Sequence, residues 1–188
     1  AASGSELERA LTQLLRDKPE LVREALNTLE QREAAARQRD DQARLAGAAR
    51  AIYSQTGATV LGNPAGDVTL VEFFDYRCAY CRHLQADINK LIQSDRQLRV
   101  LIKHLPILGP ESETAAHLVL AAGQGPTAQQ LHQRLVSARE LDAASLQAFK
   151  QPTTDKGMDK AHIERGLSDV RQLAQRLDIQ GTPALLVG

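Results

Sequence analysis

The only two cysteines of the chain are separated by two residues, in the run Cys78-Ala79-Tyr80-Cys81. A structural disulfide framework uses several cysteines scattered along a chain, and a closed zinc site needs two further ligands at suitable spacing. Neither requirement is met, because His83 is the sole nearby imidazole and histidines 104, 117, 132 and 162 show no metal-type spacing. The pair therefore indicates a redox-active dithiol that needs no cofactor beyond its own disulfide.

The first cysteine is predicted to be the nucleophile. The run Phe74-Asp75-Tyr76-Arg77 leads from a predicted strand into a helix, so Cys78 falls in the first helical turn. There, unpaired backbone N–H groups and the positive end of the helix dipole favour a thiolate. Cys81 lies one turn further along, near enough to attack a mixed disulfide at Cys78 and release the substrate. We therefore expect Cys81 to be the resolving cysteine.

The residues beside the cysteine pair determine the charge and the shape of its surroundings. Arg77, Arg82 and His83 bring positive charge close to Cys78, although arginines in a first turn are just as often solvated surface residues. Tyr80 either packs beside the sulfurs or covers the helix surface. His83, Ala79 and Tyr80 are therefore predicted neighbours of the active site.

A resolving thiol needs a base to take its proton. Two carboxylates precede the pair, Glu72 within the predicted strand and Asp75 just after it. Either could relay a proton from Cys81, and the sequence does not choose between them.

A second candidate element is Gly181-Thr182-Pro183, directly before a predicted strand at 184–187. An X–Pro bond next to a glycine can form a cis turn, although only about 5–6% of X–Pro bonds in folded proteins are cis. A cis turn facing the cysteines would expose the Thr182 backbone to an extended substrate strand. That expectation depends on the family resemblance given below.

The elements around the cysteines alternate as in an α/β domain. Strands are predicted at 59–61, 67–74 and 99–103, and a helix runs from the cysteines to about Ser94. The strand–helix–strand unit is expected to cross over right-handedly. Further helices are predicted at 113–124, 127–138, 143–151 and 160–177, as a helical block inserted before the last strand.

Residues 5 to about 56 are rich in the strong helix formers Ala, Leu, Glu, Gln and Arg. An apolar seam with four-then-three spacing occurs twice: Leu7, Leu11 and Leu14, then Val22, Leu26 and Leu29. Such a narrow seam pairs with another helix. The pattern predicts a helical stalk that joins copies of the chain. The alternative is a helical hairpin folded back on the catalytic domain.

The composition of the chain excludes some classes of binding partner. The 188 residues are 43% hydrophobic, and 23 Lys and Arg balance 23 Asp and Glu, so no bulk attraction to nucleic acid is expected. No apolar run reaches the roughly 18 residues of a membrane-spanning helix, so no membrane insertion is expected. The chain opens Ala1-Ala2-Ser3 without Met, as after removal of a signal peptide, although an arbitrary start would look the same. We expect the protein to be exported.

Three separated motifs resemble the DsbA-type thioredoxin family and, within it, the suppressor-of-copper-sensitivity protein C (ScsC) group. They are Phe73-Phe74-Asp75-Tyr76-Arg77-Cys78-Ala79-Tyr80-Cys81, Lys103-His104-Leu105-Pro106-Ile107-Leu108-Gly109-Pro110-Glu111-Ser112, and Gly181-Thr182-Pro183. The resemblance covers about residues 57–188. Residues 5–50 also resemble the N-terminal helical region of that group, which in several members is a trimerisation stalk with a flexible linker.

The resemblance implies an α/β thioredoxin fold at 57–188 with a helical insertion at about 111–177, after an N-terminal helical oligomerisation region and linker at 1–56. It implies Cys78 as nucleophile, Cys81 as resolving cysteine, and Thr182 with Pro183 as a substrate-binding cis-proline loop. Ala79 stands where relatives often carry proline or glycine, which leaves the oxidant strength open. Such domains also carry a final strand and helix beyond the position of Gly188.

The resemblance further implies the function. We expect an oligomeric periplasmic protein disulfide isomerase, a homotrimer through its N-terminal helices, that shuffles disulfides in cysteine-containing secreted proteins. A membrane redox partner of unknown identity would reset the pair. The alternatives are a monomeric dithiol oxidase and a copper-tolerance protein that holds Cu(I) between the thiolates of Cys78 and Cys81.

Overall fold

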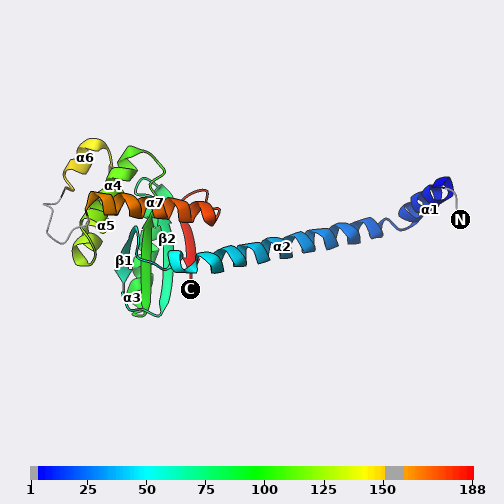
Figure 1. Ribbon diagram of the computed structural model, residues 1–188, viewed down its shortest axis with the longest axis horizontal. Coiled ribbons are helices and arrows are strands. Elements are labelled where there is room, and N and C mark those ends of the chain that lie inside the picture. The colour runs from blue at the N-terminus through cyan, green and yellow to red at the C-terminus, as the bar shows by residue number, and fades with distance from the viewer. Residues whose placement is uncertain (1–3, 151–158) are drawn as a thin grey trace. The chain divides into compact units, whose positions relative to one another are not determined.

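The computed structural model describes residues 4–150 and 159–188, and the chain divides into two compact units that meet between Ala46 and Gly47. The first unit contains helix α1 (Gly4–Asp17) and most of helix α2 (Glu20–Ile52) (Figure 1). The second unit contains the end of α2, the sheet and all other helices. The run Ala1-Ala2-Ser3 and residues 151–158, of which residue 151 ends the helix predicted at 143–151, lie outside the described residues.

Four strands form the sheet of the second unit, in the order β1-β3-β2-β4. They are β1 (Ala58–Gly62), β2 (Val68–Phe74), β3 (Leu98–His104) and β4 (Ala184–Val187). Strands β2 and β3 are parallel, whereas β1 and β4 run antiparallel to their neighbours. The four predicted strands are confirmed, and β2, the helix after it and β3 make the predicted crossover unit.

The predicted helices of the second unit are also present. They are α3 (Ala79–Ser94), α4 (Pro110–Ala121), α5 (Pro126–Ser137), α6 (Ala143–Gln147) and α7 (Lys160–Arg176). Helices α4 and α5 begin earlier than predicted, because Pro110 and Pro126 occupy the first helical turn. Proline fits there, since its missing N–H group would have no partner in the helix anyway.

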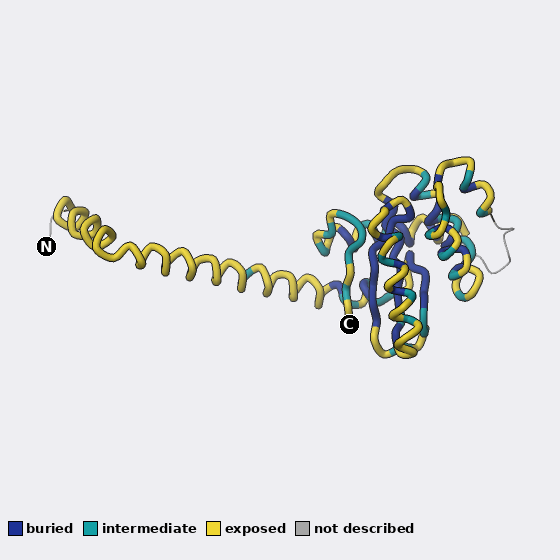
Figure 2. Tube along the Cα trace, turned by 180° about the vertical axis from the view of Figure 1, so that it is seen from behind, coloured by how far each residue is buried: buried dark blue, intermediate teal, exposed yellow. Residues whose placement is uncertain are grey.

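The two faces of the sheet bury different helices. Leu70 and Phe74 of β2 pack in a cluster with α3, α4, α5 and α6, while Val71 and Phe73 pack with α7 and the end of α2. This alternation follows from the two-residue period of a strand. The buried strands appear dark blue in Figure 2. Because α3 lies on the first of these faces, both cysteines belong to that cluster.

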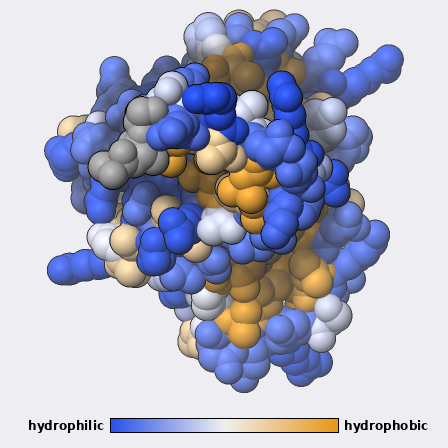
Figure 3. All heavy atoms as spheres, turned by 90° about the vertical axis from the view of Figure 1, so that its right-hand side faces the viewer, coloured by the Kyte–Doolittle hydropathy of each residue, from blue (hydrophilic) through white to orange (hydrophobic). Residues whose placement is uncertain are grey.

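The N-terminal helices keep their apolar seam at the surface. No residue of α1 is buried, and all six seam residues are more than one third exposed. Figure 3 shows apolar side chains gathered in patches on a surface that is otherwise mostly hydrophilic. None of the described helices combines the length and apolarity that a membrane span requires.

Candidate active site

Cys78 occupies the N-cap position of α3, with backbone angles of φ −74° and ψ 112°. Its sulfur accepts a hydrogen bond from the backbone N–H of Cys81, with 3.3 Å between the two heavy atoms. This N–H is one of those that a helix leaves without an internal partner at its start. The arrangement therefore offers a hydrogen-bond donor and the positive end of the helix dipole to a negative sulfur.

The two sulfurs differ in access to solvent. Both cysteines are free thiols, and Cys78 is 6% exposed whereas Cys81 is fully buried. Burial raises the pKa of Cys81 well above its usual value, because a charged thiolate is poorly solvated there. Cys78 can therefore meet a substrate, while Cys81 needs a base before it can act as a nucleophile.

The loop before β4 lies against Cys78. The Thr182–Pro183 peptide bond is cis, and the Cys78 thiol donates a hydrogen bond to the carbonyl oxygen of Thr182 over 3.3 Å. Thr182 and Pro183 are half-buried. The structure thus brings together the two motifs that the sequence analysis singled out, although they are more than one hundred residues apart.

The three predicted neighbours of the pair lie at the surface. Ala79 and His83 are exposed, and the side chain of Tyr80 is 78% exposed. Of the two positions considered for Tyr80, the structure therefore shows the one on the helix surface. Its ring is open to a molecule that approaches Cys78.

The two arginines beside the pair make hydrogen bonds to the helical insertion. Arg77 donates to Glu111 over 2.9 Å, and Arg82 donates through Nε to the carbonyl oxygen of Val136 over 2.9 Å. Glu111 lies in α4 and Val136 in α5. Both guanidinium groups therefore tie the start of α3 to the helical insertion.

Asp75 is an anchor for the active-site turn. One carboxylate oxygen accepts hydrogen bonds from the backbone N–H of Arg77 and the hydroxyl of Ser112, at 2.8 and 2.7 Å. The other accepts from the backbone N–H groups of Ile107 and Leu108, at 2.8 and 2.9 Å. With both oxygens occupied in this way, Asp75 fixes the loop after β3 and is a poor candidate for proton transfer.

Glu72 is the better candidate for proton transfer. It is fully buried, and its Oε2 atom accepts a hydrogen bond from Nε2 of Gln85 over 2.7 Å, while its Oε1 atom has no partner among the residues that the structure describes. Burial raises its pKa from 4.5 to about 8, and the bond from Gln85 acts in the opposite direction. Cys81 and Gln85 are four residues apart on the buried face of α3, so Glu72 lies beneath the first turns of that helix.

Further polar residues of the site were missed by the sequence analysis. Gln85 Oε1 lies 3.1 Å from Nε2 of His132 in α5, and His132 Nδ1 lies 2.7 Å from the hydroxyl of Tyr76. All three side chains are buried. A polar residue on the apolar face of the predicted helix marked Gln85, but no local pattern pointed to His132.

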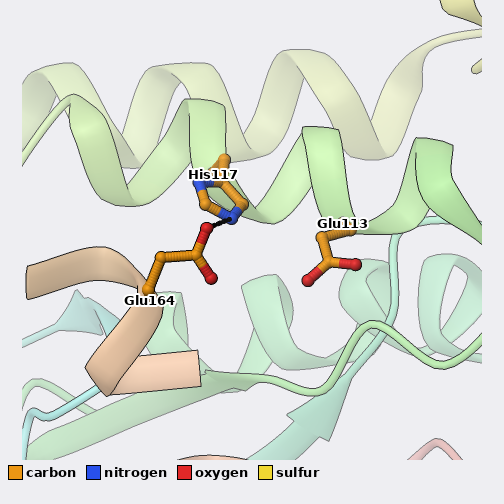
Figure 4. Close-up of side chains that lie close together, drawn as sticks. All are labelled: Glu113, His117 and Glu164. Carbon is orange, nitrogen blue, oxygen red and sulfur yellow. Dashed lines mark ion pairs between the residues drawn. The ribbon is translucent and has the colours of Figure 1, made fainter. Parts of the chain in front are cut away.

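One other group of described side chains could hold a metal ion. Glu113 and His117 of α4 and Glu164 of α7 place one ligand atom each within 4.8 Å of one another (Figure 4). His117 pairs with Glu164 at 3.4 Å, and Glu113 accepts a hydrogen bond from Arg171 over 2.6 Å. All are partly exposed, and these pairings account for the arrangement without a metal. The spacing of the histidines in the sequence could not predict that the packing of α4 and α7 brings Glu164 next to His117.

Known proteins resemble this chain in both sequence and structure. A family model described as thioredoxin matches residues 54–188. Proteus mirabilis ScsC in a transitional conformation shares 30% identity, covering 100% of this chain and 89% of that one, with a TM-score of 0.67. A thioredoxin-like oxidoreductase from Silicibacter pomeroyi shares 34% identity over 70% of this chain and 80% of that one, with a TM-score of 0.58. The resemblance inferred from the sequence is confirmed.

Two further similarities are partial. A periplasmic thioredoxin-like protein from Salmonella enterica serovar Typhimurium shares 29% identity, covering 73% of this chain and 82% of that one, with a TM-score of 0.65. A protein of Salinispora arenicola named Na(+)/H(+) antiporter NhaA 1 shares 27% identity over 68% of this chain. The chain spans only 21% of the length of that curated relative, so the name describes a much longer protein.

Proposed function

This chain belongs to the thioredoxin family, and from that premise we propose that it exchanges disulfides with protein substrates through Cys78 and Cys81. The observation that carries the proposal is the position of the Cys78 sulfur. It lies at the start of α3, within hydrogen-bonding distance of the Thr182 carbonyl, and is the less buried of the two sulfurs.

The chemistry follows from the different environments of the two thiols. The Cys78 thiolate attacks a substrate disulfide, forms a mixed disulfide and releases one substrate sulfur as a thiolate. Cys81 then gives its proton to Oε1 of Glu72 and attacks the Cys78 sulfur, which forms the internal disulfide and frees the second substrate sulfur. In isomerisation, a substrate thiolate attacks the mixed disulfide instead and regenerates the Cys78 thiolate. The two sulfurs carry the electrons, so we propose no further cofactor.

We further propose that the enzyme is an isomerase and a homotrimer joined through its N-terminal helices. Six exposed apolar residues at helical seam spacing support association, because surface of this kind is stabilised when it packs against another helix. An enzyme with several active sites can hold one thiol of a misfolded client while another site acts. A monomeric oxidase would need no such seam.

The test is the refolding of scrambled ribonuclease, compared with the oxidation of reduced ribonuclease. We expect the full chain to restore activity to the scrambled protein under reducing conditions, and the Cys78→Ser variant to restore none. A protein that oxidises reduced ribonuclease but leaves the scrambled form inactive would be an oxidase, and the isomerase proposal would be wrong.

We place this reaction in the periplasm, where disulfides form and persist. The support is the likeness to the periplasmic Salmonella protein. A membrane redox partner would reset the cysteine pair after each reaction. Fractionation of cells that express the full gene tests the location: recovery in the cytoplasm would contradict it.

A further inference from the structure

We propose that Gln85 and His132 are positioning residues that orient the carboxyl group of Glu72. By holding its Oε2 atom, they leave Oε1 as the atom that exchanges a proton with Cys81. This inference rests on the proposed function, because it concerns the base that the resolving step requires. It extends that function to two residues that act through Glu72.

The four side chains form a continuous buried line. Gln85 Nε2 donates to Glu72 Oε2 over 2.7 Å, and Gln85 Oε1 lies 3.1 Å from His132 Nε2. The line ends at Tyr76, whose hydroxyl lies 2.7 Å from His132 Nδ1. Each of the four residues is at most 1% exposed. Water therefore does not compete for these bonds, and each polar group depends on its neighbour in the line.

The direction of every bond follows when Glu72 is ionised, which is the form that can accept a proton from Cys81. A carboxylate only accepts hydrogen bonds, so the amide NH₂ of Gln85 must face it and the amide oxygen must face His132. Burial lowers the pKa of His132 to about 3, so its ring is neutral and carries one N–H. That proton sits on Nε2 and points at Gln85, and Nδ1 accepts from the Tyr76 hydroxyl. His132 thus prevents the Gln85 amide from turning its oxygen towards Glu72.

Titratable groups occur on the elements that pack on the same face of the sheet as Glu72. Helix α3 contributes Cys81, helix α5 contributes His132, and the turn between β2 and α3 contributes Tyr76. Burial keeps Tyr76 protonated, since it raises the pKa of that phenol well above 10 and the charge of Glu72 raises it further. Tyr76 is therefore a stable donor at the end of the line.

The strands beside β2 contribute one more group on this face. His104 of β3 stacks on the Tyr76 ring with centroids 5.7 Å apart, and burial lowers its pKa to about 3, so it is neutral. Lys103 is paired with Phe73 in the sheet and belongs to the opposite face, where its Nζ donates to the carbonyl oxygen of Ser54 over 2.8 Å. Residues 184–187 of β4 carry no titratable side chain. Among the described residues, no fixed charge therefore replaces Gln85 as the group that stabilises ionised Glu72.

The experiment separates the two thiol steps with a chromogenic aromatic disulfide, 5,5′-dithiobis(2-nitrobenzoate). The reduced full chain releases one coloured thiolate when Cys78 attacks the reagent and a second when Cys81 displaces it. We expect the rate of the second release to depend on ionisation of Glu72. In Gln85→Leu the midpoint of that pH profile should move upward by roughly one unit, because the lost bond stabilised the ionised form. The pH profile of the first release should stay unchanged.

His132→Phe tests the second residue, since it frees the Gln85 amide to rotate. We expect an upward shift in the same direction and smaller than that of Gln85→Leu. The matched control is Gln133→Leu, which removes a reciprocal amide pair between Gln133 and Asn89 on the same two helices. A merely structural role of the line would lower the melting temperature of all three variants and shift none of the profiles.

The outcomes separate this inference from the proposed function. Suppose that Glu72→Gln alters the second release but Gln85→Leu does not move the midpoint of its pH profile. The positioning role of Gln85 is then wrong, while the assignment of Glu72 as the base is retained. If Glu72→Gln leaves the profile unchanged, the base assignment itself is wrong. Should Gln85→Leu not fold, Gln85→Met keeps an unbranched side chain of similar length and carries the same expectation.

Discussion

The thiol of Cys78 donates a hydrogen bond to the backbone carbonyl oxygen of Thr182 over 3.3 Å, although the two residues lie 104 positions apart. This contact sets the loop before β4 against the start of α3. Since Cys78 is only 6% exposed, its sulfur can be reached from few directions. Exposed apolar side chains, such as those of Tyr80 and Ile107, are available for contact with unfolded protein.

Replacing each cysteine by serine should separate their roles. We expect Cys78→Ser to lose all reduction of insulin, because the accessible nucleophile is gone. Cys81→Ser should instead accumulate mixed disulfides with substrate proteins, since the second thiol that would release them is missing. Non-reducing gel electrophoresis of the two variants, mixed with an unfolded disulfide protein, checks this. Accumulation in Cys78→Ser would reverse the assignment.

The hydroxyl of Thr182 should influence the resolving thiol. A hydrogen bond from this side chain works against the burial that raises the pKa of Cys81. Thr182→Val keeps the shape and removes the hydroxyl, so we expect the displacement by Cys81 to slow by roughly two- to tenfold. Thr182→Ser retains the hydroxyl and should stay close to the unchanged chain. Equal slowing in both variants would mean that packing, and not the hydroxyl, is responsible.

Glu72 should make the folded state less stable at alkaline pH. Its pKa is about 8 in the folded protein against an ordinary value of 4.5, so the folded state binds more protons between these values. The free energy of unfolding therefore falls as pH rises from about 4.5 to about 8. Urea unfolding across this range should show a shallower decline for Glu72→Gln than for the unchanged chain. Parallel curves would show that Glu72 does not hold its proton in the folded state.

The buried histidines should act in the opposite sense at acidic pH. His104 and His132 have a pKa of about 3 in the folded protein against 6.5 ordinarily, so the unfolded chain binds more protons between these values. Their contribution to stability is present above pH 6.5 and is lost as pH falls towards 3. Together with Glu72, this predicts greatest stability near pH 6.5. His132→Phe should lose part of the acid-side slope in the same urea series.

The seam of the N-terminal helices should control the oligomeric state. We expect a double variant, Leu11→Asp with Leu26→Asp, to dissociate the proposed trimer, because it places buried charges between helices. Its reaction with the chromogenic disulfide should be unchanged, while refolding of scrambled ribonuclease falls. Gln31→Asp adds a charge on the opposite side of α2 and is the control. Sedimentation of the unchanged chain as a monomer would contradict the trimer directly.

Patterns that depend on neighbouring residues were predictable. The β-branched run 68–74, the helix after Cys78 and the seam that includes Leu26 follow from side-chain periods of about two and 3.6 residues. The spacing of Cys78 and Cys81 likewise indicated a dithiol at a helix start, and the structure has both residues there. The division at residue 56 stays a prediction, as does the oligomeric role of the helices.

The sequence by itself determined the reactive pair, the elements around it and the family, because these depend on residue types at short range. Only the tertiary structure decided between Asp75, whose oxygens bind four donors, and Glu72, which keeps one oxygen without a partner. It also brought His132 to Gln85 and Tyr76, across 47 and 56 positions. Such contacts arise from the packing of helices across a shared core, and no local periodicity encodes which buried polar groups will meet.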